Sequence, residues 1–139
     1  MSKPNLISGN VHADQRGKVR YNNDFDAAAI KRMYVIENQS QTLVRAWVGH
    51  QIEQRWFSAV AGSFEIQLIA IDDWQNPSKN LSKLIFKLDA ENMTILHIPK
   101  GFVSSIRALE DDAKLLVMAD YLIGQTTDEY RFEPNYFQP

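Results

Sequence analysis

His50 is the residue of this chain best suited to acid–base chemistry. It lies two positions after Val48, which is the last residue of the β-rich run 43–48. Side chains two residues apart on a β-strand point to the same face, so Val48 and His50 are expected to share one face of a strand, toward a barrel mouth. An imidazole with a pKa of about 6.5 can accept or donate a proton near neutral pH. We therefore predict a catalytic role for His50; the alternative is a hydrogen-bonded core or rim residue.

Two tyrosines, Tyr34 and Tyr121, are further candidates. A neutral phenol can donate a hydrogen bond to an enolate oxygen as negative charge develops on it. The alternative for both is packing with the hydroxyl at the surface. His97 alternates with apolar neighbours, which favours a structural role on the opposite face of its strand. His12 lies in an N-terminal edge segment, where we expect surface exposure or a contact between subunits.

Short β-rich runs separated by turn residues make up most of the chain. Runs of this length at regular spacing favour a sandwich or barrel over a βαβ fold, so we predict one all-β domain over residues 1–139. The expected strands are 43–48, 56–60, 64–71, 84–88, 93–98 and 114–121. The expected turns are 14–17, 61–63, 76–78, 89–92 and 110–112, and helical turns are expected over 24–33 and 126–130.

Composition excludes several classes of protein. The formal net charge of -2 and the pI of about 5.9 argue against non-specific nucleic-acid binding, which needs a basic surface. With no cysteine, the chain has neither disulfides nor a thiolate metal site. No apolar run is long enough for a signal peptide core or a membrane span. The sequence therefore predicts a soluble cytoplasmic protein with no membrane partner.

Several motifs occur in a recognisable order. Arg45, Val48, His50, Gln54 and 62–64 match the spacing of Arg-Gly-x-His-x-His, a Gln four residues on, and then Gly-Ser-Phe. Further matches are Lys-Arg-Met-Tyr-Val-Ile at 31–36, Ile-Pro-Lys-Gly-Phe at 98–102, the acidic and Tyr-rich segment 128–137, and Asp-Gln-Arg-Gly at 14–17. This series resembles the metal-independent sugar-nucleotide cupins, which include dTDP-4-dehydrorhamnose 3,5-epimerases and dTDP-4-keto-6-deoxyhexose 3,4-ketoisomerases.

The resemblance implies a cupin-type double-stranded β-helix, a jelly-roll barrel, that forms a homodimer. It implies an isomerase or epimerase that removes a proton beside the ketone of a nucleotide-linked 4-keto-6-deoxy sugar, in surface-polysaccharide synthesis, without a metal or other cofactor. His50 would carry the proton with Tyr34 as an aid. Arg32 and Arg45 would hold the diphosphate, because Arg recognises phosphate by bidentate hydrogen bonds. Gln54, Tyr121 and Lys100 are the remaining expected substrate contacts.

Three positions depart from the family motif. Val48 replaces the first His, Ala46 replaces the Gly after the motif Arg, and Ser104 stands where the 3,5-epimerases often keep a His. Of the positions that hold metal ligands in other cupins, only His50 keeps a ligand, so no metal is expected. Val48 favours one alternative, a cupin that binds a nucleotide sugar without turning it over. A third possibility is a related cupin that acts on a different carbohydrate.

Overall fold

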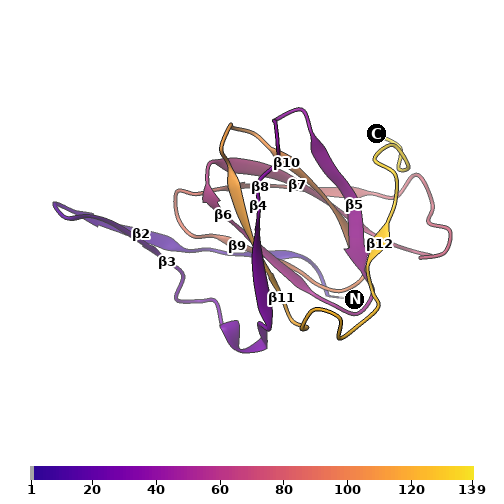
Figure 1. Ribbon diagram of the computed structural model, residues 1–139, viewed down its shortest axis with the longest axis horizontal. Helices are drawn as coiled ribbons and strands as arrows, with labels where there is room; N and C mark the ends of the chain where they lie inside the picture. Colours follow the sequence, from indigo (N-terminus) through magenta and orange to yellow (C-terminus); the bar gives the residue numbers. More distant parts are fainter. Residues whose placement is uncertain (1) are drawn as a thin grey trace.

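Two antiparallel five-stranded sheets form the body of the protein (Figure 1). The computed structural model describes residues 2–139. In order across the first sheet the strands are β1 (Asn5–Ile7), β9 (Ile95–Ile98), β6 (Arg55–Ala61), β11 (Lys114–Ala119) and β4 (Arg32–Ile36). In order across the second sheet they are β12 (Tyr130–Arg131), β5 (Val44–His50), β10 (Phe102–Ala108), β7 (Ser63–Ala70) and β8 (Lys83–Asp89).

A two-stranded ribbon projects from this body. It consists of β2 (Asn10–Asp14) and β3 (Gly17–Tyr21), paired with each other. Figure 1 shows the ribbon extending well beyond the two sheets. All residues of β2 and β3 are exposed except Tyr21, which is partly buried. The ribbon is therefore held to the body mainly through its base.

The core lies between the inner faces of the two sheets. Phe57, Leu96 and Leu115 from the first sheet contact a set that includes Phe64 and Ile66 from the second, and all five are buried. Side chains along these strands alternate between the core and the surface, which is the period-2 pattern expected from the sequence. The predicted all-β cupin barrel and its six strands are confirmed, with ends shifted by a few residues.

Of the two predicted helical turns, the one over 24–33 is confirmed in part and the one over 126–130 is wrong. Between residues 24 and 33 only one 3₁₀ turn forms, η1 (Ala27–Ala29), capped by the carboxylate of Asp26. The chain then enters β4, where the N–H of Lys31 donates to the carbonyl of Ala119 at 2.8 Å. Over 126–130 no helix forms, and Tyr130 pairs with Gly49 instead. In both places hydrogen bonding to a sheet overrides the local preference.

Gly49 allows β5 and β10 to approach each other closely. A Cβ atom at this position would lie 2.3 Å from the carbonyl oxygen of Phe102 and 2.6 Å from Cγ1 of Val103. Backbone and a buried valine cannot move aside at low cost, because the interior is close-packed. Gly49 thus permits the strand pairing that carries His50 to the end of β5.

Gly49→Ala is therefore expected to destabilise the fold by about 3 kcal/mol, the upper end of the typical cost of overpacking. Urea unfolding measures this change. Gly124→Ala is the matched control: its Cβ meets nothing within 4 Å, and only its φ of +79° opposes a side chain. The control should lose about 1 kcal/mol. Equal losses in the two variants would contradict the close approach at Gly49.

Candidate functional site

A cleft of about 570 Å³ opens between the two sheets. Strands β4, β5, β6 and β10 supply most of its walls. A narrow inner part continues toward the core residues Phe57, Ile98 and Phe102. The residues shared by the outer and inner parts are Tyr34, Val48, His50, Arg55, Ser104 and Ile106.

His50 and Val48 both line this cleft, as the strand alternation predicted. β5 runs unbroken through Gly49, so the two side chains keep the same orientation. Ser104 is paired with Val48 across the β5–β10 ladder and also faces the cleft. Val48 stands at the position of the other imidazole in the family motif. An apolar side chain therefore lies beside His50 in this cleft.

Arg55 is the buried charge at the base of the cleft. Only 7% of its surface is exposed. Its Nη2 lies 3.1 Å from Nε2 of His50, and its Nη1 donates to Oε1 of Glu53 at 2.9 Å. A guanidinium has no acceptor atom, so Nε2 of His50 must be the acceptor of this hydrogen bond. Arg55 and Glu53 form a buried ion pair that reaches His50.

Burial and the charge of Arg55 lower the pKa of His50 to about 4. The carboxylates of Glu53, Asp128 and Glu129 act in the opposite direction but do not compensate. His50 is therefore neutral at physiological pH. Burial alone would raise the pKa of Glu53, but hydrogen bonds from Thr126 and Arg55 bring it below its ordinary value.

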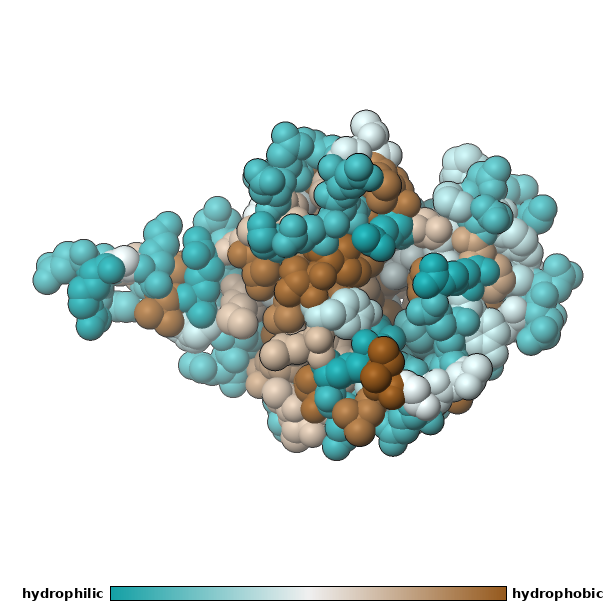
Figure 2. All heavy atoms as spheres, viewed as in Figure 1, coloured by the Kyte–Doolittle hydropathy of each residue, from teal (hydrophilic) through white to brown (hydrophobic). Residues whose placement is uncertain are grey.

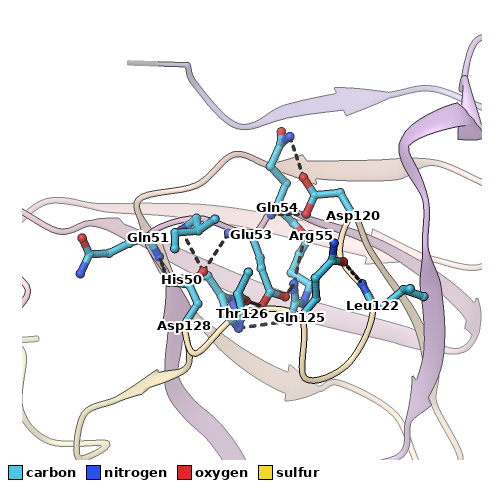
Figure 3. Close-up of polar contacts among 11 residues, drawn as sticks. His50, Gln51, Glu53, Gln54, Arg55, Asp120, Leu122, Gln125, Thr126 and Asp128 are labelled. Carbon is cyan, nitrogen blue, oxygen red and sulfur yellow. Dashed lines mark hydrogen bonds and ion pairs between the residues drawn. The ribbon is translucent and has the colours of Figure 1, made fainter.

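The C-terminal segment fixes the turn that follows β5 (Figure 3). The carboxylate of Asp128 accepts hydrogen bonds from the backbone N–H groups of Gln51, Ile52 and Glu53 at 2.8–2.9 Å. The hydroxyl of Thr126 donates to Oε2 of Glu53. Three backbone donors that the sheet does not use are thereby satisfied, and the turn between His50 and Arg55 is held in one conformation.

Arg32, Tyr34 and Arg45, all predicted from the sequence, line the same cleft as His50. The guanidinium of Arg32 lies 5.2 Å from the centre of the Tyr34 ring, a cation–π contact. Nε of Arg32 is buried and has no hydrogen-bond partner among the described residues. Nε of Arg45 donates to Asn38 at 3.0 Å.

Gln54, Lys100 and Tyr121 lie elsewhere. They line a separate hollow together with Asp120. Gln54 bonds to Asp120 through its backbone N–H at 2.8 Å and through Nε2 at 3.1 Å. Its Oε1 accepts a hydrogen bond from Nε2 of His97 at 2.6 Å. The structure therefore does not bring these three predicted contacts together with His50.

The two remaining histidines lie outside the cleft. His97 stacks on Trp56, with ring centres 4.9 Å apart, while its neighbours Leu96 and Ile98 enter the core. This is the opposite face, as the sequence predicted for His97. His12 is exposed on β2, 3.4 Å from Asp14.

The sequence reasoning missed three residues that shape the site: Glu53, Arg55 and Asp128. Glu53 and Arg55 are opposite charges two residues apart, immediately before the apolar run Trp56–Phe57. Charged residues at the start of a buried strand are a signal for a buried ion pair, because such charges are rarely buried unless paired. Asp128 gave no comparable signal, since its partners are backbone groups 75 to 77 residues away.

Among residues 2–139, no three His, Asp or Glu side chains gather in a way that could hold a metal ion. Within the same part of the chain, no helix has the length and apolar character needed to cross a membrane.

The fold and the cleft define a cupin barrel with one histidine and several arginines at its mouth. A family comparison matches residues 3–138 to the family described as "FdtA: WxcM-like, C-terminal", and the chain belongs to this family. The predicted relationship to sugar-nucleotide cupins is thereby confirmed. A search of curated proteins finds no match.

Solved structures of similar fold include three enzymes of nucleotide-sugar chemistry. QdtA, a sugar 3,4-ketoisomerase from Thermoanaerobacterium thermosaccharolyticum in complex with TDP, is 22% identical; the match covers 96% of this chain and 90% of that one, with a TM-score of 0.72. WlaRB, a TDP-quinovose 3,4-ketoisomerase from Campylobacter jejuni, is 20% identical and covers 95% of both chains, with a TM-score of 0.69. ChmJ, a 3'-monoepimerase from Streptomyces bikiniensis in complex with dTDP-quinovose, is 16% identical and covers 94% and 70%, with a TM-score of 0.75. At these identities the likeness establishes the fold.

The low pKa of His50 makes stability depend on pH. The folded protein keeps this ring neutral down to about pH 4, whereas the unfolded chain takes up a proton at about 6.5. The unfolded state therefore binds more protons between these values, and stability falls as the pH is lowered. Urea unfolding between pH 7.5 and 5 should show a loss of about 2 kcal/mol from this group.

His50→Gln should remove that part of the pH dependence, because an amide oxygen can still accept from Arg55 but does not titrate. His12→Gln, which changes an exposed ring, is the control and should keep the wild-type slope. An unchanged slope in His50→Gln would show that His50 is not held neutral.

Proposed function

We propose that this protein is an isomerase or epimerase of a nucleotide-linked 4-keto-6-deoxy sugar, acting by proton transfer next to the ketone. The observation that carries the proposal is one cleft that combines His50, Tyr34 and the side chains of Arg32 and Arg45. The chain also belongs to the family described above. Its structural neighbours are named as 3,4-ketoisomerases and a 3'-monoepimerase and include complexes with TDP or a TDP-sugar.

The chemistry requires stabilisation of an enolate. Removing a proton from carbon beside a carbonyl places negative charge on the carbonyl oxygen, and donors aimed at that oxygen lower the barrier. The ring N–H of His50 and the hydroxyl of Tyr34 are two such donors in the cleft. Both face the inner part of the cleft, which is largely apolar, so their hydrogen bonds to an oxyanion would be stronger there than in water.

The arginines suit the diphosphate. Arg32 has a buried Nε with no partner among the described residues and no carboxylate contact there. Arg45 bonds to a neutral amide rather than to an acid. Both guanidinium groups thus retain charge that a diphosphate could neutralise with bidentate hydrogen bonds. We propose that Arg32 and Arg45 bind this group, that no metal takes part, and that the protein acts in the cytoplasm.

Gln54, Lys100 and Tyr121 contact the substrate in this proposal only if the sugar nucleotide extends beyond the cleft. Their hollow shares no lining residue with the cleft around His50. In this proposal Arg32 and Arg45 are therefore the primary contacts of the ligand.

A binding protein without turnover is the second candidate. Val48 favours it, because an apolar side chain lies in the cleft where the family motif has a second imidazole. The hydrogen bond from Arg55 to His50 favours it too, since it occupies one of the two nitrogens of the one imidazole that lines the cleft among residues 2–139. The two candidates share a ligand and differ in proton exchange.

Incubation with dTDP-4-keto-6-deoxyglucose in heavy water, followed by NMR, separates these candidates. For a 3,4-ketoisomerase we expect deuterium at C4 of the 3-keto product and at C3 of substrate re-formed by the reverse reaction; for a 3,5-epimerase we expect it at C3 and C5. His50→Asn should reduce incorporation at least about 100-fold, as expected for the loss of one acid–base or oxyanion group. Arg107→Met, which changes an exposed guanidinium paired with Glu65, is the control and should exchange normally. Saturable binding without exchange would instead support the binding protein.

We also propose that the protein is a homodimer. The outer face of the first sheet carries an exposed apolar patch that includes Met33 and Val35 of β4, which are 70% and 51% exposed, and Val60 of β6. The register places Leu116 of β11 beside Val35, so the patch is continuous across β4 and β11. Figure 2 shows apolar side chains gathered over this part of the molecule. Large exposed apolar patches mark interaction surfaces, and β4 is also a free sheet edge.

Light scattering should accordingly give twice the chain mass of 16.0 kDa. A Met33→Glu, Val35→Glu variant should shift the protein toward the monomer, because charge at the patch opposes burial. Ile85→Glu is the control: Ile85 is 63% exposed on β8 of the other sheet. A monomer in the unsubstituted protein would refute this part of the proposal.

A further inference from the structure

The contact between Arg55 and His50 determines which ring nitrogen can meet a ligand. We propose that Arg55 is a positioning residue that holds the His50 ring with Nε2 as hydrogen-bond acceptor and Nδ1–H toward the cleft. His50 then contacts its ligand as a hydrogen-bond donor to a carbonyl or enolate oxygen. The identity of that oxygen rests on the proposed function; the state of the ring does not.

The geometry at Nε2 carries the first step. Nη2 of Arg55 lies 3.1 Å from Nε2, and arginine can only donate. A ring that accepts at Nε2 has its lone pair there, and a neutral imidazole then carries its hydrogen on Nδ1. A ring with hydrogen on Nε2 would instead place two N–H groups against each other. Arg55 therefore selects one tautomer of His50.

Arg55 is itself held in place from the other side. Its Nη1 donates to Oε1 of Glu53 at 2.9 Å and to the carbonyl of Gln54 at 3.1 Å. Thr126 in turn donates to the second oxygen of Glu53. With 7% of its surface exposed, Arg55 has no room to swing into solvent. The donor to Nε2 is thus part of a fixed chain from Thr126 to His50.

Nδ1 is the open side of the ring. Within residues 2–139, the buried side-chain nitrogen and oxygen atoms that lack a partner are Nε of Arg32 and Nε of Arg55. Nδ1 of His50 also has no protein partner among these residues, yet it is not one of those buried atoms. Because His50 lines both parts of the cleft, this nitrogen is accessible to a ligand there.

The charges around His50 agree with this arrangement. Burial and Arg55 oppose protonation of the ring, while Glu53, Asp128 and Glu129 favour it. Across the cleft, β4 contributes Tyr34 and the positive charge of Arg32. Burial and Arg55 outweigh the three acids, so the pKa of His50 is about 4 and the ring is neutral.

A neutral ring with hydrogen on Nδ1 stabilises an oxyanion but cannot take a proton at that nitrogen. Proton abstraction at Nδ1 would need the other tautomer, in which Nε2–H faces the guanidinium. Nε2 is occupied by Arg55 for as long as their hydrogen bond persists. His50 is thereby narrowed to the role of a hydrogen-bond donor, and the carboxylate of Glu129, which also lines the cleft, takes the proton from carbon in this arrangement.

NMR of the ¹⁵N-labelled imidazoles, on the full chain without ligand, tests the proposal. The chain has three histidines, so His12 and His97 serve as internal comparators, and His50→Asn assigns the signals. We expect His50 to show the Nδ1–H tautomer at pH 7. In Arg55→Met this preference should be lost, and the pKa of His50 should rise by about 1 unit or more, as expected when a nearby positive charge is removed. Arg107→Met should change neither.

An Nε2–H tautomer in the wild-type protein would overturn the proposal, as would an unchanged tautomer and pKa in Arg55→Met. If Arg55→Met leaves Glu53 unpaired and does not fold, the double variant Glu53→Gln, Arg55→Met removes both buried charges and gives the same readout. None of these measurements needs a substrate. An Nδ1–H ring in a protein that shows no deuterium exchange would therefore support this inference while contradicting the proposed reaction.

Discussion

The positive charge of Arg55, buried between the two sheets, constrains the arrangement of the whole cleft. Moving an ion from water into a protein interior costs of order several kcal/mol even after relaxation. That cost is tolerable here because Glu53 supplies the opposite charge and Gln54 a carbonyl, both from the turn before β6. Nε2 of His50 accepts from Nη2, while Nε of Arg55 has no partner among residues 2–139. The imidazole of His50, which faces the cleft, is thus one of the partners that stabilise the buried guanidinium of Arg55.

This arrangement ties the site to distant parts of the chain. Glu53 can accept from Arg55 only while the turn after β5 keeps its shape, and Asp128 and Thr126 hold that turn from the C-terminal segment. The same segment continues as β12, which pairs with Gly49 and Val48. The floor, the turn and one wall of the cleft are therefore joined by hydrogen bonds that link residues more than 70 positions apart.

Much of the fold and part of the site were predictable from the sequence, for a physical reason. Strand alternation is local, so the shared face of Val48 and His50 and the opposite face of His97 followed from period 2 alone. Gln54, Lys100 and Tyr121 gather in a different hollow because all three lie on turns outside the strands, where strand alternation does not determine the direction of a side chain. The opposite charges of Glu53 and Arg55 at the start of β6 do signal a buried ion pair, but its support by Thr126 is a contact across 73 residues that no local pattern indicates.

Val48 gives the cleft a further property. Its backbone carries the pairing with Ser104 and Arg131, while its side chain contributes only an apolar surface to the cleft. The framework and the chemistry at this position are therefore independent: a different side chain at residue 48 alters what the cleft can do to a ligand and leaves every hydrogen bond of the ladder in place. A substitution at this one strand position can therefore change the reaction during evolution, while the architecture of the barrel stays the same.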